Sequence, residues 1–385
     1  MAQNSVPKRA ATKLKEAEAL KKARIESAEA SHAAASAKNR GNIMRTIPEE
    51  VHSVMQNYDG INGEVKRNLQ KMLMTGHLAG TGKMLILPVD QGFEHGPTRS
   101  FAKNPDAYDP HYHFKMAIDC GFSAFAAPLG MLQTGGKTFK DKIPTILKLN
   151  SSNMLKKEDA NAKDQAITAT VEDAVRLGCS GVGFTLYAGS AKCDEQLEEL
   201  RDIRIKAEAA GLVLFVWAYP RGGNATITAE STENALEITQ YAVHMAALAG
   251  AHVIKTKLPS VEVCSDAGIE MHEKTKAIKA IKQSAFNGRR LVIFSGGEAK
   301  TMAHVVHDAQ SISEADGGGM IVGRNMFQRP YKDAELLASA TMLALNGVKP
   351  DINLYNSINA GSSLVNEGEI SQILQQYVQK AQKIS

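Results

Sequence analysis

The sequence lacks the features that mark secreted, membrane or zinc-ribbon proteins. It has only four cysteines in 385 residues, Cys120, Cys179, Cys193 and Cys264, and no two of them stand in a CxxC spacing. This argues against a zinc ribbon or a disulfide framework and fits a reducing compartment. No stretch approaches the roughly 18 consecutive apolar residues of a membrane helix. The first forty residues contain no apolar segment of the signal-peptide kind, so we expect a cytoplasmic protein.

The net charge of +4 is confined to the beginning of the chain. Residues 1–40 carry nine cationic and four acidic side chains, a net charge of +5, so the remainder is nearly neutral at −1. This segment has 12 alanines and no aromatic residue, which predicts a helix from about Ala10 to Ala37 with a weakly packing face. We interpret residues 1–47 as a solvated basic extension. A transit peptide is disfavoured by the four acidic residues, and a partner-binding or oligomer-binding arm is the alternative.

A repeating pattern of short apolar runs and amphipathic segments follows a helical stretch between Pro48 and Met74. The runs are Met84–Val89, Phe122–Ala127, Thr145–Leu149, Gly181–Leu186, Leu212–Tyr219, Ala251–Lys257, Leu291–Phe294 and Gly319–Val322. The segments predicted as helices include Lys163–Leu177, Asp194–Ala210, Ala229–Ala249, Glu270–Gln283, Ala299–Ala315 and Lys332–Leu345. Eight buried parallel strands alternating with helices predict an α/β fold of the (β/α)₈ TIM-barrel type.

The domain limits follow from this pattern. The barrel should span residues 48–346, and residues 347–385 should form a helical segment packed on or beyond it. A doubly wound sheet is the competing architecture, but it normally carries a GxGxxG turn after the first strand. The first strand here ends in Val89-Asp90-Gln91-Gly92 instead.

Polar residues stand at the carboxyl ends of the predicted strands, where the active site of a TIM barrel lies. Asp90 ends the first strand, Lys148 lies in the third, and Trp217 and Tyr219 share one face of the fifth. Lys255 and Lys257 lie in the sixth.

Burial lowers the pKa of a lysine, and a neutral amine can attack a carbonyl to form a Schiff base. The structural alternatives are a lysine that only fills the barrel, an Asp90 that caps a helix and a Trp217 that packs in the core.

The last two strand ends resemble a phosphate site. Ser295-Gly296-Gly297 follows the seventh strand and Gly323-Arg324 follows the eighth. Bare backbone N–H groups with a nearby guanidinium bind phosphate, and TIM barrels often do so between these two strands. A plain turn is the commoner meaning of either sequence alone. His304 and His307 are three apart on a predicted helix, but the outer face of a barrel helix makes a metal site there improbable.

Several segments together resemble one enzyme family, the archaeal and bacterial type of class I fructose-bisphosphate aldolase, also called the DhnA family. The segments are Thr75–Pro97 with its Asp-Gln-Gly-Phe-Glu-His-Gly, Ile146–Asn150, Val216–Arg221 with its Trp-Ala-Tyr, Gly250–Lys257, Phe294–Gly297 and Gly323–Asn325. The resemblance covers roughly Pro48 to Leu345. It departs after Lys257, where Leu258–Cys264 lacks the Tyr-Thr-Gly type of sequence, so it assigns no residues to the distal phosphate.

The resemblance implies a (β/α)₈ barrel that needs no metal and no cofactor and forms an imine. It implies that Lys255 forms the Schiff base, with Lys257 as the second candidate, that Tyr219 is the acid/base and that Asp90 assists. It further implies that the substrate contacts Lys148, Trp217, Ser295, Gly296, Gly297, Gly323 and Arg324.

The reaction expected from the resemblance is reversible cleavage of fructose 1,6-bisphosphate in glycolysis and gluconeogenesis by a homo-oligomer such as a decamer. We expect no nucleic-acid or membrane partner. The alternative is an aldolase, or a thiolase- or transaldolase-like enzyme of the same family, that acts on another phosphorylated ketose or dione. A non-catalytic scaffold with a partner-binding arm is a third interpretation, disfavoured by the set Asp90, Lys148, Tyr219 and Lys255.

Overall fold

The computed structural model describes residues 47–153, 155, 159, 161–222, 235–259, 274–297 and 300–349. The predicted helix Ala10–Ala37 lies outside these residues, as does nearly all of the predicted segment 347–385. The same holds for the first part of the predicted helices Ala229–Ala249 and Glu270–Gln283. The domain limits at residues 47 and 346 therefore stay predictions.

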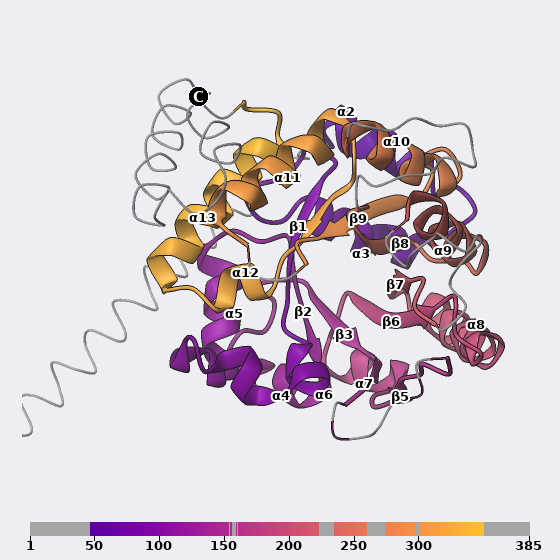
Figure 1. Ribbon diagram of the computed structural model, residues 1–385, viewed down its shortest axis with the longest axis horizontal. Helices are drawn as coiled ribbons and strands as arrows, with labels where there is room; N and C mark the ends of the chain where they lie inside the picture. The colour runs from indigo at the N-terminus through magenta and orange to yellow at the C-terminus, as the bar shows by residue number, and fades with distance from the viewer. Residues whose placement is uncertain are drawn as a thin grey trace, which may run out of the picture. The chain divides into compact units, whose positions relative to one another are not determined.

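The eight predicted strands are present and form one closed parallel barrel (Figure 1). They are β1 (Met84–Pro88), β2 (Ala124–Pro128), β3 (Thr145–Lys148), β6 (Gly181–Tyr187), β7 (Val213–Tyr219), β8 (Val253–Lys257), β9 (Leu291–Ser295) and β10 (Gly319–Ile321). The barrel closes where β1 pairs with both β2 and β10. The (β/α)₈ prediction is thus confirmed, and each strand agrees with its predicted limits to within two residues.

Helices surround the barrel, and two more precede it in the chain. They are α2 (Glu49–Gln56), α3 (Gly63–Leu73), α4 (Gln91–Phe101), η1 (Pro105–Tyr108), α5 (Pro110–Asp119), α6 (Leu129–Gly135), α7 (Val171–Arg176), α8 (Cys193–Ala209), α9 (Leu236–Leu248), α10 (Lys274–Ser284), α11 (Met302–Glu314), α12 (Arg324–Phe327) and α13 (Tyr331–Leu345). Of the described helices, none has the length and apolar character needed to cross a membrane.

The predicted helix Lys163–Leu177 is wrong in its first half. Ala166–Ile167 forms a short strand, β5, that pairs antiparallel with β4 (Asn150–Ser151). Helix α7 starts only after Thr170, whose side chain accepts a hydrogen bond from Asp173 N while the Asp173 side chain accepts one from Thr170 N. This capping box fixes the helix start at Val171, and the preceding backbone is free to pair as a strand.

The barrel interior is filled by inward-facing apolar side chains that continue into α2 and α3. Met84, Ile86, Phe215 and Ile293 are fully buried in this cluster, and Leu69 of α3 packs against it. Such layers make the barrel a packed core and not a pore. A second cluster fills the space between the strands and the outer helices. The α2 and α3 helices therefore close the amino-terminal end of the barrel, which leaves the carboxyl end for a site.

Candidate active site

A pocket lies at the carboxyl ends of the strands and gathers nearly all of the predicted site residues. It is lined by Pro88, Asp90, Gln91, Glu94, His95, Trp217, Tyr219, Arg221, Lys255, Lys257, Ser295, Gly296, Gly297, Ile321, Gly323 and Arg324. Lys148 is the one predicted residue outside this lining. The residues come from β1, β7, β8, β9 and β10 and from the loops and helix starts that follow these strands, so the barrel brings together side chains that are far apart in sequence.

Lys255 is a buried lysine whose amine faces aromatic rings. Its side chain is 5 % exposed, and Nζ lies 5.2 Å from the Trp217 ring centre and 5.4 Å from that of Tyr219. Among the described residues Nζ meets no hydrogen-bond acceptor. Burial lowers its pKa to about 8, although the negative charges of Asp90 and Glu94 act in the opposite direction. Burial therefore makes the neutral amine, which is the nucleophilic form, more accessible near neutral pH.

Lys148 is equally buried but is held by polar partners. Its Nζ donates to Asn150 O, to Asn150 Oδ1 at 2.8 Å and to Gln165 Oε1 at 3.0 Å. Burial lowers its pKa to about 8 as well. Three donors meet three acceptors, so the ammonium form is fully satisfied. Lys148 thus lies outside the pocket lining, with its Nζ 5.6 Å from the Trp217 ring centre. Direct contact of Lys148 with a substrate stays a prediction.

Trp217 separates the two lysines, and a glycine makes room for it. A Cβ on Gly183 of β6 would overlap the Trp217 ring. In the barrel register Trp217 stands beside Lys255, and Lys148 stands beside Gly183. The indole is 1 % exposed and its Nε1 has no hydrogen-bond partner among the described residues. The ring therefore forms an apolar floor beside the Lys255 amine.

Tyr219 lies at the end of β7 with its ring between cations. Burial raises its pKa, and the negative charges of Glu94 and Asp90 raise it further, against the charges of Arg221 and Arg324. The Arg221 guanidinium carbon is 5.1 Å from the Tyr219 ring centre. The phenol therefore holds its proton at neutral pH and can donate it to a reacting oxygen or carbon.

Asp90 does not cap a helix with its side chain, which sets aside the structural interpretation of this residue. It occupies the residue before α4, but its carboxylate makes no capping hydrogen bond. The side chain is 7 % exposed and faces the pocket. Its charge raises the pKa of both Lys255 and Lys148, so it is electrostatically coupled to both amines.

The two glycine loops after β9 and β10 are joined to each other. Arg324 Nη2 donates to Gly297 O at 3.2 Å, and Asn325 Nδ2 donates to Gly296 O at 3.4 Å. Asn325 Oδ1 accepts from Lys300 N at 2.7 Å. The loops therefore form one polar rim beside Lys255 and Lys257. Cations and bare backbone of this kind suit a phosphate group.

Sequence reasoning missed four polar lining residues, Gln91, Glu94, His95 and Arg221, as well as Gln165 behind them. The first four lie inside two of the segments that carry the resemblance, Thr75–Pro97 and Val216–Arg221, so their position there was the available signal. Gln165 lies in the connection between β3 and β6 and has no such signal. His304 and His307 lie on α11, outside the pocket, and the described residues contain no cluster of three or more potential metal ligands.

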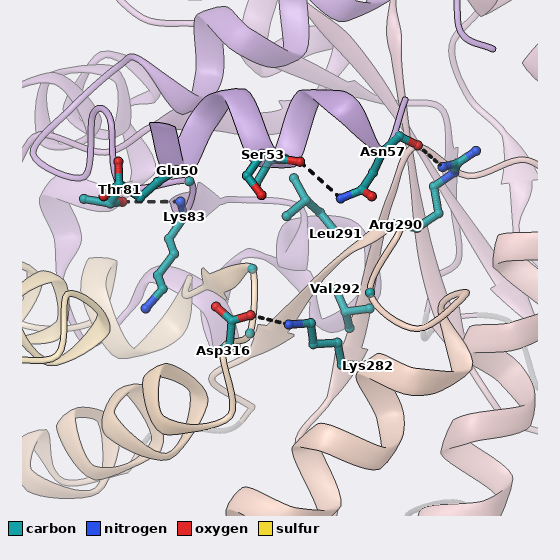
Figure 2. Close-up of a pocket in the computed structure, with 15 residues that line it drawn as sticks. Glu50, Ser53, Asn57, Thr81, Lys83, Lys282, Arg290, Leu291, Val292 and Asp316 are labelled. Atoms are coloured by element: carbon teal, nitrogen blue, oxygen red, sulfur yellow. Dashed lines mark hydrogen bonds and ion pairs between the residues drawn. The ribbon is translucent and has the colours of Figure 1, made fainter. Parts of the chain in front are cut away.

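A second pocket lies at the opposite, amino-terminal end of the barrel (Figure 2). It is formed by α2, α10 and the segments that enter β1, β9 and β10, and its charged residues are Glu50, Lys83, Lys282, Arg290 and Asp316. No residue predicted for the site lies there. In TIM barrels this end serves stability and the other end serves catalysis.

Comparison with known proteins finds aldolases among the relatives of this chain. The model of the DeoC/LacD family aldolases matches residues 84–329, which span β1 to α12. A probable class 1 fructose-bisphosphate aldolase of Chlamydia trachomatis is 33% identical over 71% of this chain and 82% of its own length. The class 1 fructose-bisphosphate aldolase of Thermoproteus tenax is 34% identical over 70% of this chain and 92% of its own.

A solved structure extends the match to the barrel itself. It is an archaeal fructose-1,6-bisphosphate aldolase with the catalytic Lys covalently bound to the carbinolamine intermediate of its substrate. The two chains are 30% identical, with a TM-score of 0.59 over 76% of this chain and 100% of the other. The matched barrel, the family model and both relatives lead to one conclusion: the chain belongs to the DeoC/LacD family of aldolases.

Proposed function

We propose that this aldolase forms a Schiff base and reversibly cleaves fructose 1,6-bisphosphate to dihydroxyacetone phosphate and glyceraldehyde 3-phosphate. The observation that carries the proposal is Lys255, a buried amine with a pKa of about 8 at a strand end. It faces Trp217 and Tyr219 and stands next to a phosphate-type rim. The substrate assignment is supported by the two relatives and the archaeal structure, all three of which are named as fructose-bisphosphate aldolases.

The proposed reaction begins with attack of the neutral Lys255 amine on the C2 ketone. Asp90 assists proton transfer as the carbinolamine forms and loses water to give the protonated imine. The imine accepts the electron pair of the breaking C3–C4 bond, which leaves an enamine. Tyr219 relays a proton: its hydroxyl oxygen takes the proton of the C4 hydroxyl as its own proton passes to C3 of the enamine. Hydrolysis of the imine releases dihydroxyacetone phosphate and restores the amine.

The other predicted site residues bind, orient or shield the substrate in this proposal. Ser295, Gly296, Gly297, Gly323 and Arg324 hold the C1 phosphate and so fix the ketone over Lys255. Trp217 excludes water from the amine. Lys148 supplies a fixed positive charge behind the indole. Cytoplasmic location, a role in glycolysis and gluconeogenesis and assembly into a homo-oligomer stay predictions from the resemblance.

Borohydride reduction in the presence of dihydroxyacetone phosphate tests the imine, the residue and the substrate together. We expect a covalent adduct whose mass maps to Lys255, and none on Lys255→Met. Lys257→Met is the matched control, because Lys257 lies two residues along the same strand and lines the same pocket. An adduct mapped to Lys257, or an adduct that persists in Lys255→Met, overturns the assignment. Turnover of a panel of phosphorylated ketoses then tests whether fructose 1,6-bisphosphate is the preferred substrate.

A further inference from the structure

Glu94 presents one free carboxylate oxygen to the active-site pocket. It lies in the first turn of α4, and its side chain is 23% exposed. Its Oε1 accepts a hydrogen bond from Gln165 Nε2 at 3.1 Å. Its Oε2 has only His95 Nε2 nearby, at 3.9 Å, which is beyond hydrogen-bond distance. Among the described residues Oε2 thus has no hydrogen-bond donor, although Glu94 lines the pocket.

Gln165 fixes where that carboxylate lies. It is 3% exposed and joins three elements: its Oε1 accepts from Lys148 on β3, and its Nε2 donates to Glu94 and to Tyr187 Oη on β6, the latter at 2.8 Å. The amide cannot turn over, because Lys148 has no acceptor to offer and an ionised Glu94 has no donor. Lys148 at Oε1 and Glu94 at Nε2 therefore fix the orientation of the Gln165 amide. The amide in turn fixes the position of the Glu94 carboxylate.

The carboxylate belongs to the part of the pocket away from the phosphate rim. Gln165 draws Glu94 towards β3 and β6, whereas the rim follows β9 and β10. Its neighbours on that side are Tyr187 and Tyr219, which pair across β6 and β7. A carboxylate repels phosphate but accepts readily from a hydroxyl group. This side of the pocket is thus suited to a neutral hydroxyl.

We propose that Glu94 is a specificity-determining residue that accepts a hydrogen bond from the 2-hydroxyl of the aldehyde half of the substrate, and that Gln165 is the positioning residue that holds it. This rests on the proposed function, in which the C1 phosphate occupies the rim and the aldehyde half lies on the other side of Lys255. Glyceraldehyde 3-phosphate has one hydroxyl besides its reacting carbonyl, the one on C2. Glu94 therefore selects 2-hydroxyaldehydes.

The test compares two aldehydes in the direction of synthesis, with dihydroxyacetone phosphate as the donor. One is glyceraldehyde 3-phosphate and the other is 3-phosphopropanal, which lacks only the 2-hydroxyl. The measured quantity is the ratio of their kcat/KM values. A hydrogen bond to a charged group should make this ratio fall about 10- to 100-fold in Glu94→Ala. The proposal is overturned if the ratio in Glu94→Ala stays within twofold of the wild-type ratio. It is also overturned if the wild-type enzyme does not prefer glyceraldehyde 3-phosphate to 3-phosphopropanal.

Gln165→Glu isolates the positioning role. It keeps an oxygen for Lys148 but replaces the N–H facing Glu94 with an oxygen that repels it, so we expect the ratio to fall as in Glu94→Ala. An unchanged ratio overturns the role of Gln165. Glu198→Gln on the exposed face of α8 is the matched control and should keep the wild-type ratio.

The borohydride trap separates this inference from the proposed function. A wild-type enzyme that gives no adduct on Lys255 contradicts the proposed function. An adduct together with a ratio that does not depend on Glu94 contradicts only the inference.

Discussion

The two ends of the barrel both hold charged pockets, but their charges are arranged differently. At the amino-terminal end Lys282 forms an ion pair with Asp316 (Figure 2), and Lys83 Nζ donates to Leu345 O at 2.7 Å and to Ser313 Oγ at 3.1 Å. Arg290 Nη1 donates to Asn57 O at 2.9 Å. At the carboxyl end Lys255 faces two aromatic rings and, among the described residues, no acceptor.

The difference shows that charge alone does not mark the active site of this barrel. A cation with acceptors is already satisfied and gains little from a ligand. A buried amine without them is destabilised as an ammonium ion and becomes a nucleophile. The buried Lys255 amine at the carboxyl end thus lowers the stability of the fold but supplies a nucleophile. The cations at the amino-terminal end have acceptors and do neither. Three variants test this contrast.

Lys255→Met should have the largest effect, because it removes the nucleophile. We expect kcat for fructose 1,6-bisphosphate cleavage to fall about 10⁴-fold or more. Stopped assays coupled to the formation of triose phosphate measure this. The control is Lys282→Met at the other end of the barrel, which should keep wild-type kcat. Residual kcat within tenfold of wild type in Lys255→Met contradicts the assignment of the nucleophile.

Tyr219→Phe should come next, since it removes the group that moves a proton but keeps the ring beside Lys255. Loss of a general acid/base lowers the rate about 10²- to 10⁴-fold. Imine formation precedes this step, so borohydride should still trap dihydroxyacetone phosphate on Lys255. Trapping combined with slow cleavage is the diagnostic result. Cleavage at the wild-type rate in Tyr219→Phe means that another group carries the proton.

The contrast also shows what sequence alone could predict. Strand limits such as Val213–Tyr219 follow from local apolar runs between turn residues, and the strand ends then locate Asp90, Tyr219 and Lys255. The acceptors of Lys148 could be predicted only in part, because Asn150 stands two residues along the chain but Gln165 meets Lys148 only after the chain folds back. The same fold-back pairs β4 with β5, where a helix was predicted. Long-range hydrogen bonds thus decide which buried lysine is satisfied and which is free.

Lys255→Met should also make the protein more stable at neutral pH. The pKa of Lys255 in the folded protein, about 8, is below the 10.5 of an ordinary lysine, so the unfolded chain binds more protons between these values. Stability is lost as the pH falls from 10.5 to 8 and stays reduced below that. Removing the amine should raise the free energy of unfolding by up to about 3 kcal/mol at pH 7. Urea unfolding at pH 7 and pH 10 measures it, and the gain should shrink at the higher pH.

Lys282→Met should have the smallest effect and the opposite sign. Its partner Asp316 is 83% exposed, so water screens the ion pair and its loss should lower the free energy of unfolding by less than about 1 kcal/mol. The pocket lies at the far end of the barrel from Lys255, so kcat and KM should stay at wild-type values. Urea unfolding and cleavage assays on the same preparation check both. A large fall in kcat would mean that the amino-terminal pocket influences catalysis, and the division between a stable end and a reactive end would not hold.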